Sequence, residues 1–233
     1  MGARFETVSV ADRPLCFGQR RAFSRGGLEC FMRAASKFRP RTKPPEERRD
    51  EIMKAARRLF LKQGVAPTTI EQITSGADVA KGTFYLYFSS KDDVLAALGD
   101  RFAQELLATM KAAIAEKANE DWKGKLAAWA RAGVNGYLDS MRLHDIIFYG
   151  SRPRTRERLV DNIIIDHLCG LLQGGVDAGA WSIDGARFTA VFLFSGLHGI
   201  VDASHVTGKR VDRTRLAQRL EQLCFRAVGL LPR

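Results

Sequence analysis

The chain of 233 residues is 45% hydrophobic and 27% charged, which is typical of a globular protein and excludes a disordered or fibrous chain. No run approaches the roughly 18 consecutive apolar residues of a membrane span, and the four cysteines form no close pair, so we expect a cytoplasmic protein with free thiols. The formal net charge of +11 is carried mainly by residues 1–44, with ten basic against three acidic side chains, whereas residues 45–100 carry eight against nine. Charge alone therefore says little about the partner of that second segment.

Residues 1–45 show neither a helical nor a strand period, and we interpret them as a disordered basic arm that ends in a linker. Two explanations of the arm remain open. It adds nonspecific contacts to phosphates, or it reflects an upstream start, with Met32 as the first natural residue. After the arm we expect two further regions, 46–92 and 93–233.

A long amphipathic helix is predicted from Glu46 onward, and Gly64 should end it. Its apolar positions follow the spacing i, i+3, i+4, i+7 and i+8: Ile52, Ala55, Ala56, Leu59 and Phe60. Two short helices should follow, over residues 70–77 and 79–87, with a turn at Ala77–Asp78. Two capping boxes are predicted before the first of them: Thr68 with Glu71, and Thr69 with Gln72.

Two short helices joined by a tight turn and preceded by a longer helix form a three-helix DNA-binding unit. In the second short helix, Phe84 and Phe88 lie four residues apart and should face inward with Ala80. Lys81 and Tyr85 share another face, which we expect to be exposed.

The exposed part of this helix offers several ways of binding a duplex. Lys81 stands near the helix N-terminus, where the dipole favours anions, and can contact a base or a phosphate. Gly82 lets the backbone approach a phosphate closely, and Thr83 offers a hydroxyl donor. Tyr85 and Tyr87 carry hydroxyls beyond the aromatic core, although both tyrosines could simply fill that core.

The rest of the chain is predicted to be one helix after another, beginning with a long helix from Lys91 that Ser89 and Ser90 can cap. The further helices should cover residues 121–141, with Asp121 as the cap, 154–176, 183–206 and 212–230. The glycines expected to end helices are Gly174–Gly175, Gly179 and Gly208. No run alternates with period two, so the fold class is all-α.

Aromatic side chains in the middle helices can line a pocket for an apolar or planar ligand, although each one alone is more simply explained as part of an ordinary core. The candidates for such a pocket are Trp129, Tyr137 and Phe148, followed by Phe102 and Met110. On residues 183–206, His198, Asp202 and His205 share one helix face, which we interpret as a polar strip at the rim of an interface and not as a metal site.

An enzyme is not expected, because the sequence contains no HExxH, GxSxG, phosphate-binding loop or dinucleotide glycine pattern. We accordingly expect no catalytic residue, no cofactor and no metal. A DNA-binding protein without ligand control is a further alternative, and it would bind with a steep salt dependence and little sequence preference.

The segment TTIEQITSGADVAKGTFYLYFSSKDDVLAAL, Thr68 to Leu98, resembles the signature of the TetR family of transcriptional regulators. The preceding RRDEIMKAARRLFLKQG resembles the first helix of that family. The resemblance covers about residues 48–98, and beyond Leu98 it extends only to architecture. It implies an all-helical homodimer in which a helix-turn-helix domain precedes a helical domain for effector binding and dimerisation.

The resemblance also implies roles for individual residues. The DNA-contacting positions of the family fall on Thr69, Lys81, Gly82, Thr83, Tyr85, Tyr87 and Lys91. The last two helices, about residues 183–230, would form the dimer interface, and the helices before them would enclose a small-molecule effector of unknown identity. Asp78 stands where the family often has glycine, and aspartate tolerates the left-handed geometry of such a turn.

We therefore predict a TetR-like repressor that binds a palindromic operator in double-stranded DNA as a dimer and is released by a small molecule. When bound to DNA, it would be associated with the nucleoid. A DNA-binding activator, or a regulator without a ligand, is the alternative on the same fold.

Overall fold

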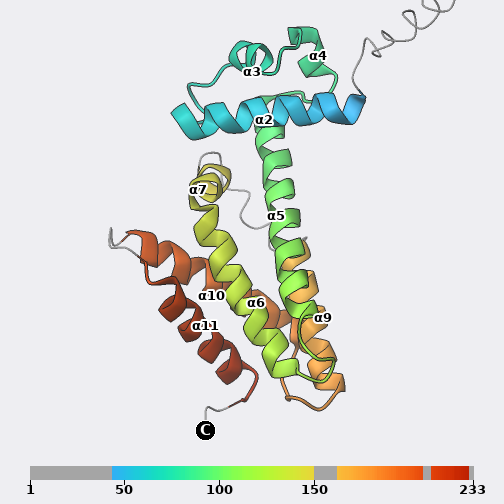
Figure 1. Cartoon of the computed structure of the whole chain (residues 1–233), viewed down its shortest axis with the longest axis vertical. Coiled ribbons are helices and arrows are strands. Elements are labelled where there is room, and N and C mark those ends of the chain that lie inside the picture. Colours follow the sequence, from blue (N-terminus) through green and yellow to red (C-terminus); the bar gives the residue numbers. More distant parts are fainter. Residues whose placement is uncertain (1–43, 150–161, 207–210, 231–233) are drawn as a thin grey trace, which may run out of the picture. The chain divides into compact units, whose positions relative to one another are not determined.

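A computed structural model describes residues 44–149, 162–206 and 211–230, and all regular structure in these ranges is helical (Figure 1), which confirms the predicted all-α class. The helices in chain order are α2 (Pro45–Gln63), α3 (Ile70–Gly76), α4 (Lys81–Tyr85), α5 (Lys91–Ala115), α6 (Trp122–Asp139), α7 (Met141–Tyr149), α9 (Ile163–Asp177), α10 (Ala186–Val206) and α11 (Arg213–Ala227). The predicted arm lies outside the described residues, apart from its last two positions.

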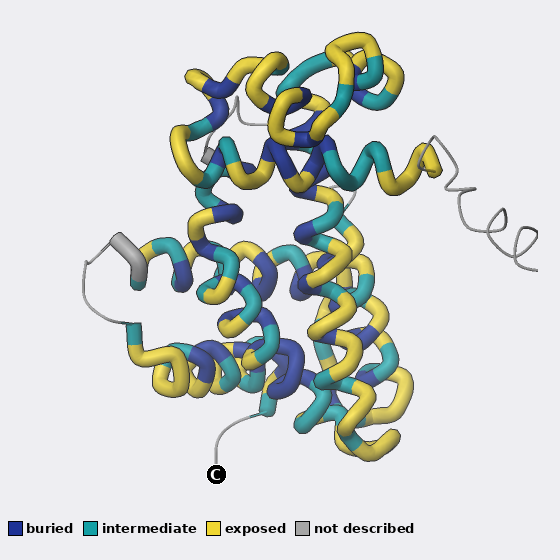
Figure 2. Tube along the Cα trace, turned by 45° about the horizontal axis from the view of Figure 1, so that its top comes forward, coloured by how far each residue is buried: buried dark blue, intermediate teal, exposed yellow. Residues whose placement is uncertain are grey.

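Helix α6 packs against both α5 and α11 and lies between them in Figure 1, while α10 packs against α9. Along each helix, buried positions recur between exposed ones, as Figure 2 shows. This pattern follows from the 3.6-residue period of the apolar side chains. None of the described helices combines the length and apolarity that crossing a bilayer requires.

The predicted helix over residues 121–141 is instead two helices. Asp121 caps α6 as expected, with its side chain accepting a hydrogen bond from the N–H of Gly124. The helix then ends at Asp139, and α7 begins at Met141 after a break at Ser140. Part of the helix predicted over residues 154–176 falls outside the described residues, and so does Gly208.

The predicted helix end at Gly174–Gly175 is wrong, because α9 continues through both residues to Asp177. A Cβ on Gly174 would lie 2.7 Å from the ring of Trp122, and one on Gly175 would lie 2.1 Å from the ring of Trp181. These two glycines therefore make room for indole rings and do not reverse the chain. Gly179, with φ +70°, follows the end of α9 as predicted.

Two polar contacts connect α2 with the helical body. Arg101 on α5 forms an ion pair with Asp50, and this partner lowers the pKa of the Asp50 carboxyl. Arg142 on α7 donates a hydrogen bond of 3.1 Å to the carbonyl oxygen of Leu61 near the other end of α2. Helix α2 is thus held at two points, by α5 and by α7.

Candidate nucleic-acid interface

Helices α2, α3 and α4 bury apolar side chains at one end of the hydrophobic core, which continues into the helices that follow. The predicted stripe of α2 is confirmed for Ile52, Ala55, Ala56 and Phe60, which are buried, whereas Leu59 is only partly buried. Ile73 of α3 and Phe84 of α4 are fully buried in the same core. Because these contacts fix the short helices from the inside, their outer faces are free to present side chains to a partner.

The turn between α3 and α4 has the backbone geometry that the sequence predicted. Asp78 adopts φ 53°, the left-handed conformation that glycine often supplies. The N–H of Val79 then donates to the carbonyl of Thr74 at 3.0 Å, and the Thr74 hydroxyl donates to the carbonyl of Glu71. A Cβ on Gly76 would lie 3.4 Å from the Cβ of Ala55, so this glycine allows close packing of α3 against α2.

Only one of the two predicted capping boxes forms. The Thr69 hydroxyl accepts a hydrogen bond from the N–H of Gln72, and the Gln72 side chain accepts one from the N–H of Thr69. The expected box of Thr68 with Glu71 is wrong, because Thr68 is buried and donates its hydroxyl hydrogen to the carbonyl of Gly64 at 2.7 Å. Thr69 is exposed at the start of α3 and accessible to a partner.

The side chain of Lys91 is partly buried and its ammonium group is already engaged by the chain itself. Its ammonium group donates to three backbone carbonyls of the loop between α2 and α3, those of Val65, Ala66 and Thr68, at 3.0, 3.1 and 2.5 Å. Lys91 thereby fixes the loop that presents Thr69. A phosphate contact through this ammonium would have to compete with these three acceptors, which the sequence pattern did not indicate.

We expect that replacing Lys91 by methionine lowers the free energy of unfolding by about 1–3 kcal/mol, because charged hydrogen bonds to the three carbonyls are lost while the aliphatic stem remains. Urea unfolding followed by circular dichroism measures the change. Lys62→Met, at an exposed position near the end of α2, is the matched control and should shift stability by less than about 0.5 kcal/mol. Unchanged stability of the Lys91 variant would contradict a structural role for this side chain.

Helix α4 begins later than predicted, at Lys81. Ala80 is its N-cap residue, with extended backbone angles of φ −68° and ψ 151°, and it is exposed. The expectation that Ala80 faces inward with Phe84 and Phe88 is therefore wrong, whereas both phenylalanines are buried as predicted. The shorter helix leaves Ala80 outside the helical period on which that expectation was based.

The predicted contact residues differ in exposure. Lys81 and Gly82 are exposed, Tyr85 retains 51% of its accessible surface, and Thr83 and Tyr87 are partly buried. Tyr87 packs against the apolar core, so part of its ring helps to fill that core, as the alternative interpretation expected. A Cβ on Gly82 would meet no atom of the described chain within 4 Å, so the chain itself gives this glycine no packing role.

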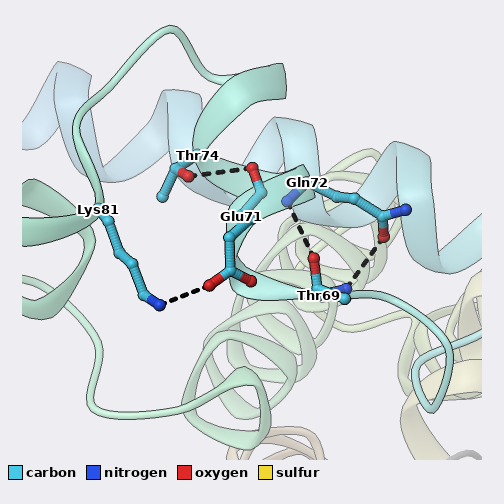
Figure 3. A network of polar contacts seen from close by, with 5 residues as sticks. All are labelled: Thr69, Glu71, Gln72, Thr74 and Lys81. Carbon is cyan, nitrogen blue, oxygen red and sulfur yellow. Dashed lines mark hydrogen bonds and ion pairs between the residues drawn. The ribbon is translucent and has the colours of Figure 1, made fainter.

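Two exposed residues beside these were not indicated by the sequence. Leu86 follows Gly82 by one helical turn and is 80% exposed, which places it on the side of α4 away from the buried Phe84. Glu71 on α3 forms an ion pair with Lys81 across the turn (Figure 3). Their hydrogen bond lowers the pKa of the Glu71 carboxyl and raises the pKa of the Lys81 ammonium.

The aromatic residues predicted for an effector pocket are buried in the helical body. Trp129 and Met110 are inaccessible, and Phe102 meets Tyr137 edge to face with ring centroids 5.9 Å apart. The side chain of Phe148 lies outside the described residues. The indole N–H of Trp129 is buried and finds no hydrogen-bond partner in the part of the chain that the structure describes.

Two histidines that the sequence did not assign to this region join the aromatic residues. His144 of α7 and His198 of α10 lie with ring centroids 4.7 and 4.3 Å from the ring of Tyr137, whose hydroxyl contacts His198. His198 thus points into the body and does not belong to the predicted polar strip. The described residues hold no group of three side chains that could bind a metal ion, and the side chain of His205 lies outside them.

Comparisons with known proteins show which family the helix-turn-helix segment resembles. Residues 52–98 match the family described as bacterial regulatory proteins, tetR family. The HTH-type transcriptional regulator HbdR of Aromatoleum sp. (strain CIB) is 52% identical over 50 residues, 22% of each chain. The uncharacterized HTH-type transcriptional regulator YerO of Bacillus subtilis (strain 168) is 47% identical over 49 residues, 21% of this chain and 17% of that protein.

The similarity to these two regulators thus spans only about a fifth of their length. The similarity in fold to one solved structure covers most of the chain. The fatty acid degradation regulator FadR from Bacillus halodurans superimposes with a TM-score of 0.62 over 79% of this chain and 96% of its own, at 23% identity. At that identity the likeness concerns the fold alone.

Proposed function

Because the chain belongs to the TetR family of bacterial regulatory proteins through residues 52–98, we propose that it is a transcriptional repressor that binds operator DNA with α4. Residues 46–92 would be the DNA-binding domain, and residues 93–233 the domain for effector binding and dimerisation. One observation carries the proposal: α4 is anchored by the fully buried Phe84 and turns Lys81, Gly82 and Tyr85 outward. A short helix held from one side is suited to lie in a major groove.

The proposed contacts follow from the chemistry of each side chain. Lys81 and Thr83 donate hydrogen bonds to phosphates or base edges, and the exposed Tyr85 contributes its hydroxyl. Tyr87 is half-buried and contributes through its hydroxyl. Thr69, at the start of α3, contacts a phosphate. For Lys91 we propose an indirect role, through the loop carbonyls that it holds.

A homodimer through about residues 183–230 is supported by a row of exposed residues on α10. Two large apolar side chains are followed by three small ones on the same side: Phe188, Phe192, Ser195, Gly199 and Ala203. Phe188 and Phe192 keep 78% and 63% of their surface in a single subunit, an arrangement that a second copy would cover. Size-exclusion chromatography with light scattering tests this, and a monomer at micromolar concentration would contradict it.

For the effector we propose a small, largely apolar ligand bound beside Trp129, Tyr137, Phe102 and Met110. The support is the buried indole N–H of Trp129, which lacks a partner in the described chain and could donate to a ligand oxygen. A ligand that favours a conformer with wrongly spaced recognition helices would release the operator. A thermal-shift screen with Trp129→Phe as control tests this. Ligands that stabilise both proteins equally would argue against the Trp129 contact.

The function is tested by selecting bound duplexes from a random library with the purified protein. We expect the recovered sites to contain two half-sites related by two-fold symmetry, with centres about 34 Å apart. Their enrichment should persist when the salt concentration is raised, because base contacts depend less on salt than phosphate contacts do. In transcription assays, the protein should lower initiation from a promoter that carries the selected site. Recovery of unrelated sequences, lost at higher salt, would contradict the proposal.

A further inference from the structure

The face formed by α3 and α4 carries no excess of positive charge. Among residues 70–85, all of which the structure describes, the charged side chains are Glu71, Asp78 and Lys81. This segment therefore carries one cationic and two anionic side chains, although its proposed partner, DNA, is a polyanion. Attraction to phosphates cannot come from the net charge of this segment.

Lys81 is also already paired. Its ammonium group contacts the Glu71 carboxylate, and the two side chains retain 55% and 62% of their accessible surface. Figure 3 shows the pair bridging from α4 to α3, next to the capping box that Thr69 and Gln72 form. Because that box and the hydrogen bond of Thr74 hold α3, the Glu71 side chain projects from an ordered helix and not from a loose loop.

An ammonium group in this position gains little from an arbitrary phosphate. To reach the phosphate, Lys81 has to leave Glu71, and the released carboxylate then lies close to the same polyanion. The ion pair between Lys81 and the phosphate replaces the one between Lys81 and Glu71, and the freed Glu71 carboxylate is repelled by the phosphates. A duplex that offers only its backbone is therefore disfavoured. In the operator complex Lys81 can keep Glu71, because its ammonium group has three N–H donors and can give another one to an uncharged base edge.

We propose that Glu71 is a specificity-determining residue, which holds Lys81 and thereby suppresses binding to duplexes other than the operator. This inference rests on the proposed function, since it concerns how the same face distinguishes two kinds of DNA. Lower affinity for random sequence raises the ratio of operator to nonspecific binding, which determines occupancy where nonspecific sites are abundant.

The test compares the wild type with Glu71→Gln, which keeps the size of the side chain and removes its charge. The probes are a duplex selected by the wild type and a scrambled duplex of the same composition, titrated by fluorescence anisotropy at several salt concentrations. We expect the affinity of the variant for the scrambled duplex to rise about tenfold for a dimer, roughly threefold per released ion pair. Its salt dependence should steepen by about one phosphate contact per subunit. Affinity for the selected duplex should change less.

Two further variants separate this role from a general effect of charge. Glu105→Gln removes the same charge from an exposed position on α5 and should change neither affinity. In a Lys81→Ala background, Glu71→Gln should lose most of its effect if Glu71 acts through Lys81. Glu71→Ala repeats the charge removal without an amide, and α3 keeps its cap in both variants, since Thr69 and Gln72 form it.

The inference is overturned if the scrambled duplex is bound as weakly as before, or if the selected duplex gains as much affinity as the scrambled one. A drop in affinity for the selected duplex alone would also overturn it, since Glu71 would then be a direct operator contact. Failure of the wild type to select any sequence would instead reject the proposed function.

Discussion

Replacing Phe84 by alanine should lower the free energy of unfolding by about 3–5 kcal/mol and abolish DNA binding at growth temperature. Phe84 is fully buried and its ring lies 5.9 Å from that of Phe88, so the substitution leaves a cavity in the core of the three-helix unit. With α4 no longer anchored, the outward residues lose their fixed positions. Urea unfolding and gel-shift titration of the selected operator measure the two effects.

The neighbouring Tyr85 provides the matched comparison. Its ring touches Phe84 edge to face at 5.5 Å but is 51% exposed, so Tyr85→Ala should change stability by only about 1 kcal/mol or less. Operator affinity should nevertheless fall about tenfold or more, because a contact with DNA is removed from an intact fold. If Tyr85→Ala bound the operator like the wild type, α4 would not be the surface that contacts DNA.

Replacing Gly82 by alanine should have opposite effects on folding and on binding. The backbone of Gly82 is not in the left-handed region, and a Cβ there would contact nothing in the described chain. Alanine favours a helix over glycine by up to about 1 kcal/mol, so the variant should be as stable as the wild type or more stable. Binding should weaken about tenfold, since the methyl group would keep the helix from approaching the duplex closely.

Gly170 of α9 is the control for this substitution. It too is a helical glycine with open space around the missing Cβ, and it lies in the helical body. Gly170→Ala should therefore match any gain in stability seen with Gly82→Ala and leave operator affinity unchanged. Thermal unfolding and gel-shift titration of both variants measure these effects. Equal operator affinities of Gly82→Ala and Gly170→Ala would show that Gly82 does not face DNA.

The sequence by itself determined those features whose cause lies within a few residues. The predicted caps Thr69 before α3, Ser90 before α5 and Asp121 before α6 each accept a backbone hydrogen bond from the first turn that follows. The apolar stripe of α2 follows a helical period in the same way. Caps and periods are local, because a turn of helix is completed by the next three or four residues.

Contacts between distant segments were decided only by the tertiary structure. From the sequence, the ammonium of Lys91 was expected to contact a phosphate. In the folded chain it instead donates to the carbonyls of Val65, Ala66 and Thr68. Glu71 fits a capping box in sequence, yet it pairs with Lys81 because the turn at Asp78 brings α4 back beside α3. A charged group pairs with whichever partner the packed backbone brings within reach, and spacing along the chain does not contain that information.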